Sequence, residues 1–235
     1  MARVARIRPW AVWTTVIRFV CAQSPVEVPF SSKSYGFDGP WNAVSVSIGS
    51  PPQDVDLLPG AIWWTDVLTP AFCDNSTFSR LEVGCYPSKA GFYDNSSSTT
   101  AIWSGIPEGH PGWTQVPAQG GISNNVLDQV TFGGTTIANV SLLTADWAYG
   151  TYEPDGKTFP NYIGQLSLGA PAESQIVNGL EAALPPQQMY RNGLTPSGSF
   201  GLHLGSAASL VKPSIEGSLW FGGRLEAISV RYNYH

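Results

Sequence analysis

The sequence has few charged residues and no long apolar run. Asp, Glu, Lys and Arg make up 12% of its 235 residues, about half of the share usual in globular domains. Scarce Lys and Glu leave little material for amphipathic surface helices. No segment approaches the ~18 uninterrupted apolar residues of a membrane-spanning helix, so we expect no transmembrane segment. Basic residues do not cluster and the formal net charge is −5, which argues against nucleic acid as a partner.

Several common catalytic patterns are also missing. The chain has no G-x-S-x-G elbow and no phosphate-binding P-loop. Its three histidines, His110, His203 and His235, show no metal-ligand spacing with cysteines or acids. We therefore expect no metal and no cofactor. His203 lies in an alternating stretch, which favours a packed or surface side chain over a catalyst.

The residues that are abundant favour short strands joined by turns. The chain has 25 Gly and 19 Pro, and 43% of its residues are apolar, enough for a sizeable core. Gly and Pro between apolar runs are typical turn residues. The composition predicts an all-β fold class.

The first 22 residues resemble an export signal. Arg3, Arg6 and Arg8 precede a mostly apolar run over residues 10–20, and Val20-Cys21-Ala22 forms a small-residue exit. Arg18 interrupts the run, so an ordinary basic N-terminus or an uncleaved anchor is the alternative. Cleavage after residue 22 removes four arginines and no acids, which takes the formal charge from −5 to −9. We predict a secreted, extracellular protein.

Two further features agree with secretion. After cleavage, Cys73 and Cys85 are the cysteines that remain, and an even pair in an exported chain is a natural disulfide. A cytosolic location would leave three idle thiols. Asn75, Asn95 and Asn139 begin N-x-S/T sequons, so we predict glycosylation at these positions.

Alternating apolar residues locate most of the expected strands. Val44, Val46 and Ile48 alternate with serines, and a Gly-Ser-Pro-Pro turn separates them from a second alternating run, which predicts a hairpin. Gly133-Gly134 joins a second expected hairpin. The remaining pattern predicts a polar lead-in over residues 23–40, mostly turns over residues 73–121, and strands over residues 63–68, 126–132, 135–142, 163–168, 200–204 and 218–221.

One helix is predicted, over residues 171–184. Pro171 suits its first turn, and Ile176, Leu180 and Leu184 repeat every four residues. Pro185-Pro186 is expected to stop it. A second short turn is expected over residues 187–191.

Seven landmarks occur in a characteristic order, and together they resemble the pepsin-like aspartic peptidases in their divergent fungal form. They are Ile48 to Gln53 for I-G-T-P-P-Q, the Cys73 and Cys85 pair, Phe92 to Thr99 for F-D-P-S-x-S-S-T, Asp128 to Gly134 for D-x-V-x-x-G-G, Gly164 to Gly169 for G-x-L-G-L-G, Phe200 to Gly205, and Gly217 to Gly223 for G-x-L-x-F-G-G. The resemblance implies a pepsin-like acid-protease fold. It places an N-terminal lobe over residues 41–170, the start of a second lobe over residues 171–223 and a divergent tail over residues 224–235.

The catalytic chemistry of that family is not matched. The family uses two Asp in D-T/S-G loops, which share a proton because two close carboxylates cannot both ionise. The first of these slots, seven residues past Gln53, holds Gly60, followed by Ala61 and Ile62. No second D-T/S-G loop follows the F-G-G run, and no flap Tyr stands near Val116. The nearest acids, Asp54, Asp56 and Asp66, are expected to be solvated surface or turn carboxylates.

The sequence therefore supports three hypotheses on function. The first is a catalytically inactive aspartic peptidase homologue that binds a peptide or protein ligand in a residual cleft. The second is a truncated product of a longer homologue without a function of its own. The third is an active aspartic endopeptidase working at acid pH with displaced acids. Because a single lobe leaves an apolar face and open strand edges, we also expect self-association.

Overall fold

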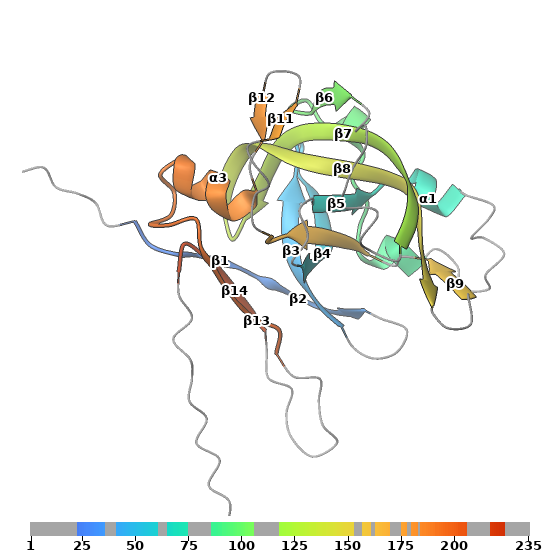
Figure 1. Ribbon diagram of the computed structural model, residues 1–235, viewed down its shortest axis with the longest axis horizontal. Coiled ribbons are helices and arrows are strands. Elements are labelled where there is room, and N and C mark those ends of the chain that lie inside the picture. The colour runs from blue at the N-terminus through green and yellow to red at the C-terminus, as the bar shows by residue number, and fades with distance from the viewer. Residues whose placement is uncertain are drawn as a thin grey trace, which may run out of the picture.

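Strands are the main secondary structure of the protein in a computed structural model (Figure 1). The residues that it describes are 23–35, 41–60, 65–74, 86–105, 118–152, 157–160, 163–169, 175–177, 180–182, 184–205 and 217–223. The predicted all-β class is confirmed. No helix in this described part has the length and apolarity needed to cross a membrane.

The larger sheet contains nine strands. They are β2 (Phe30–Tyr35), β3 (Trp41–Ile48), β4 (Gln53–Gly60), β5 (Thr65–Leu68), β6 (Ile102–Gly105), β7 (Ala118–Phe132), β8 (Thr135–Tyr152), β9 (Lys157–Pro160) and β10 (Gly164–Ser167). Both predicted hairpins are present, β3 with β4 and β7 with β8.

This sheet curls until it closes. Its order is β2-β3-β4-β10-β5-β8-β7-β6, and β3 also pairs with β7. The inward-facing residues of β3 and β4, among them Val44, Val46 and Leu57, join one buried apolar cluster with residues of β5, β7, β8 and β10. Alternation within each strand therefore sends one face to the core and leaves Ser45, Ser47 and Asp54 on the other.

A second sheet brings the two ends of the described chain together. It has the order β1-β14-β13, formed by β1 (Val26–Val28), β13 (Phe200–His203) and β14 (Ser218–Phe221). Figure 1 shows these three strands side by side below the larger sheet. The rings of Phe132 and Phe221 meet edge to face, with centroids 5.3 Å apart. The two sheets therefore share one core.

The predicted helix over residues 171–184 is wrong. Residues in that range form a small hairpin, β11 (Gln175–Val177) with β12 (Leu180–Ala182). The period of four was a coincidence in a stretch that also carries β-branched Ile176 and Val177. An Asn-Gly dipeptide stands between the two strands in the sequence, and it is the strongest short hairpin signal.

The adjacent helix begins where the sequence analysis expected a stop. Pro185 and Pro186 lie in the first turn of α3 (Pro185–Arg191), with Leu184 as its extended N-cap. A proline costs little there, because the first N–H groups of a helix have no intrahelical partner. The other short helical segments are α1 (Ala71–Asp74), η1 (Tyr86–Lys89) and η2 (Asn95–Ser97).

Several strands lie where the sequence predicted none. The lead-in over residues 23–40 contains β1 and β2, and the stretch over residues 73–121 contains β6. The second hairpin is much longer than predicted, since β7 and β8 extend away from the Gly133-Gly134 turn to Ala118 and Tyr152. β1 pairs with a strand nearly 200 residues away, a partner that local patterning does not reveal.

Candidate functional site

The slot at which the resemblance expects the first catalytic Asp lies at the end of β4. Gly60 is the last residue of that strand, and β10 runs parallel beside it, with Ser167 opposite Gly60. The N–H of Leu168 donates to the carbonyl of Gly60 over 2.9 Å. The slot thus meets the landmark that begins at Gly164, about 100 residues later in the chain, and Gly60 brings no side chain to it. Ala61 and Ile62 lie outside the described residues.

The strands around the slot offer hydroxyl groups. β10 lies between β4 and β5, and its Ser167 N–H donates to the Oγ1 of Thr65 over 3.1 Å. Both residues are buried. The slot is therefore held by hydrogen bonds between strands, beside buried residues of β5 and β10.

Asp66 is the acid nearest in sequence after the slot, and the prediction that it is a solvated carboxylate is wrong. Its residue keeps some exposed surface, but its Oδ1 is buried and accepts no hydrogen bond within the described structure. Burial raises the pKa of the Asp66 carboxyl to about 7, since a buried carboxylate loses its hydration. Among the described residues, burial is the one cause of this shift, and none of their carboxylates contributes to it.

Three landmarks of the resemblance meet around Asp128. Its carboxylate is buried and accepts hydrogen bonds from the hydroxyls of Tyr93, over 2.7 Å, and Thr100. Burial and the neighbouring Asp128 raise the pKa of the Tyr93 hydroxyl. Gly49 has a φ of +80°, and a Cβ there would stand 2.9 Å from Asp128 Oδ2. The positive φ and the close approach to Asp128 explain why the turn after β3 carries Gly at position 49.

A second link joins the first hairpin to the polar loop behind it. The side chain of Gln53 accepts from the N–H of Asp94 over 2.8 Å and donates to its carbonyl over 2.9 Å. Asp94 caps η2, and the hydrogen bonds from Ser97 and Ser96 hold the pKa of its carboxyl below the ordinary value. These motif residues therefore stabilise the fold.

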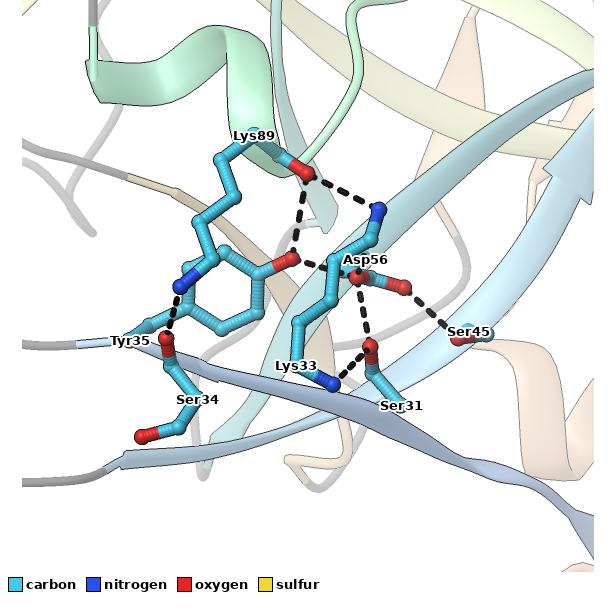
Figure 2. Close-up of polar contacts among 7 residues, drawn as sticks. All are labelled: Ser31, Lys33, Ser34, Tyr35, Ser45, Asp56 and Lys89. Carbon is cyan, nitrogen blue, oxygen red and sulfur yellow. Dashed lines mark hydrogen bonds and ion pairs between the residues drawn. The ribbon is translucent and has the colours of Figure 1, made fainter.

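Asp56 is the centre of a polar cluster that the sequence analysis missed (Figure 2). The residue is 6% exposed, so the prediction of a solvated carboxylate is wrong here as well. Its Oδ2 accepts from the hydroxyls of Tyr35 and of Ser31, the latter over 2.7 Å, and its Oδ1 accepts from Ser45 over 2.6 Å. Three hydroxyl donors thus offset the hydration that the two carboxylate oxygens lose on burial.

Two lysines close the cluster on its solvent side. The Nζ of Lys33 lies 3.7 Å from Asp56 Oδ2 and donates to the Lys89 carbonyl over 2.9 Å. Lys89 in turn donates to the Ser34 carbonyl over 2.6 Å. Figure 2 shows the two side chains spanning the space between β2 and the end of η1. They tie the bent strand β2 to the closed sheet.

The alternating serines on the outer face of β3 are the sequence feature from which this cluster could have been predicted. Ser45 lies opposite Asp56 and Ser47 opposite Asp54 in the hairpin register. Alternation had marked these positions as facing away from the core. Alternation did not reveal that β2 covers Asp56 on this outer face and donates hydrogen bonds to it.

The other predicted site residues are spread over the molecule. Cys73 lies in α1, while Cys85 and Asn75 lie outside the described residues, so the disulfide stays a prediction. Asn95 begins η2, Asn139 is exposed on β8, and His203 is exposed on β13. Within the described ranges, no three side chains of His, Cys, Asp or Glu gather closely enough to hold a metal ion.

Comparison with protein families gives no match, and no curated protein matches the chain.

Proposed function

We propose that this chain is a secreted pepsin-like domain that does not cleave peptides and that acts by binding a peptide or protein. The observation that carries this proposal is the Gly60 slot, which lies at the end of β4 beside β10 and bears no acid. The contacts of Asp128 with Tyr93 and Gly49 support the resemblance, because they bring three of the landmarks together.

The alternative, an active aspartic endopeptidase with a displaced acid, rests on Asp66. This carboxyl is buried, and its pKa of about 7 is in the range of a working general acid or base. Aspartic chemistry needs two carboxylates that share a proton, and such a pair would raise a pKa through mutual repulsion. Among the described residues, burial is the one cause of the shift of Asp66 and no second carboxylate pairs with it, which favours the inactive domain.

Cleavage of a denatured protein substrate at acid pH separates the two functions. We expect the secreted protein, its Asp66→Asn variant and its Gly60→Asp variant to be equally inactive, with and without pepstatin. Pepstatin-sensitive cleavage that Asp66→Asn abolishes would establish the endopeptidase instead. Cleavage that survives Asp66→Asn would point to a contaminating peptidase, which repurification to constant specific activity identifies.

Self-association is the second part of the proposal. β13 is an end strand of the three-stranded sheet as described, and Phe200 at its start and Leu204 just after it are 39% and 54% exposed. An open strand edge with apolar side chains is a template for pairing with a second chain. We expect sedimentation to show a dimer that Leu204→Ser weakens. A monodisperse monomer over the whole accessible concentration range would contradict this part.

A further inference from the structure

A polar hollow opens where β2 leaves the sheet. β2 and β3 pair at Phe30 with Val44 and again at Ser34 with Asn42, so four steps along β2 match two along β3. The two extra residues make β2 bulge away from the sheet, as strand bulges do. The space beneath has a volume of about 580 Å³, within the range of small-molecule sites.

The floor of the hollow consists of paired donors and acceptors. Ser45 lies opposite Asp56, and Ser47 donates from its hydroxyl to Asp54 Oδ1. On the far side, the hydroxyl of Thr131 shares a hydrogen bond of 2.7 Å with that of Thr136. These contacts hold the hydroxyls in place before any ligand arrives, which lowers the entropy cost of binding.

Some of these groups keep hydrogen-bonding capacity toward the hollow. Asp54 is exposed, and its Oδ2 accepts no hydrogen bond among the described residues. Ser32 is exposed on the bulge. Lys33 is 51% exposed, and its ammonium has a third N–H beyond its contacts with Lys89 and Asp56. The hollow thus presents a carboxylate oxygen of Asp54, the hydroxyl of Ser32 and one remaining N–H of the Lys33 ammonium.

We propose that this hollow binds a neutral saccharide. Each sugar hydroxyl both donates and accepts, so adjacent hydroxyls suit a carboxylate, a serine and an ammonium set side by side. An anion would face Asp54, which has no cation of its own in the described structure. A cationic ligand would be repelled by Lys33, whose ammonium already lies 3.7 Å from the Asp56 carboxylate. The proposal does not depend on the loss of peptidase activity, since the hollow and the Gly60 slot are lined by different residues.

The test uses the full secreted chain with cellobiose, mannobiose and N,N′-diacetylchitobiose as neutral probes, and citrate and spermidine as charged ones. Ligand-observed NMR and calorimetry measure binding. We expect at least one disaccharide to bind saturably, and Asp54→Ala and Ser47→Ala each to weaken it by about tenfold, as expected for losing a hydrogen bond with a charged group. His203→Ala, an exposed change outside the hollow, is the control and should leave affinity unchanged.

Thermal melts verify that each variant is folded, and Ser32→Ala on the exposed bulge replaces any variant that is not. Weaker binding by the hollow variants, with the control unaffected, supports the proposal. It is overturned if no disaccharide binds at millimolar concentration, if the hollow variants bind as the wild type does, or if only spermidine or citrate binds. A peptidase assay on the same preparation is read separately.

Discussion

The carbonyl of Gly60 and the N–H of Leu168 form a 2.9 Å hydrogen bond that joins the end of β4 to the end of β10. This contact places a glycine at the position for which the resemblance expects a catalytic acid. Because β10 also packs between β4 and β5, a substitution that disturbs β10 tests whether its packing holds the slot in place.

Gly164 at the start of β10 should not tolerate a side chain. A Cβ there would stand 2.2 Å from the Asp66 carbonyl and 2.8 Å from a Leu57 methyl group. We expect Gly164→Ala to destabilise the protein by about 1–3 kcal/mol, as overpacking does. Urea unfolding measures this. Gly198→Ala is the matched control, because its Cβ would meet neighbours no nearer than 3.4 Å; equal stability losses would show that β10 is not tightly packed.

Asp66 should make the protein more stable in acid. Its folded pKa of about 7 lies above the unfolded value near 3.8, so the folded state binds the proton more tightly. The contribution of Asp66 to stability is therefore greatest below pH 4 and is lost as the pH rises toward 7, by up to ~4 kcal/mol. Asp66→Asn should remove this slope and raise the melting temperature at pH 8.

The cause of the shift gives this prediction a control. Because burial rather than a charged neighbour raises the pKa, high ionic strength should leave the slope of stability against pH unchanged. A slope that salt suppresses, or one that persists in Asp66→Asn, would assign the pH dependence to other groups.

Tyr35→Phe should cost about 1–3 kcal/mol of stability, because it removes a donor from the buried Asp56 carboxylate. Chemical denaturation compares it with Tyr190→Phe, a change of the same kind at a residue that is 53% exposed. The control should be nearly neutral. Similar losses in both variants would mean that the hydroxyl of Tyr35 does not support Asp56.

Asn139 should carry a glycan when the chain passes through a eukaryotic secretory pathway. It is exposed, and its φ of +57° projects it from a left-handed position in β8, a conformation that asparagine tolerates well. Mass spectrometry before and after glycosidase treatment should show the modification, and Ser141→Ala should abolish it while keeping Asn139. An unmodified Asn139 in fully secreted protein would contradict the prediction.

Strand positions with strong alternation could be predicted from the sequence, and weaker elements could not. The hairpin of β3 and β4 and the Gly133-Gly134 turn both follow from local patterns. The segment after Pro171 was misread because a chance period of four outweighed an Asn-Gly turn. β1 was missed because its partner, β14, lies at the other end of the described chain.

The sequence by itself determined the all-β class, the faces of the main strands and the lack of an acid at Gly60. These depend on side-chain type and on a period of two, which are local properties. Only the tertiary structure decided which acids are buried. Asp54, Asp56 and Asp66 look alike in sequence, but β2 covers Asp56 with hydroxyl donors, the closed sheet buries Asp66 Oδ1, and Asp54 stays exposed. Burial and hydrogen-bond partners come from strands distant in the chain, and they set the properties of each carboxylate.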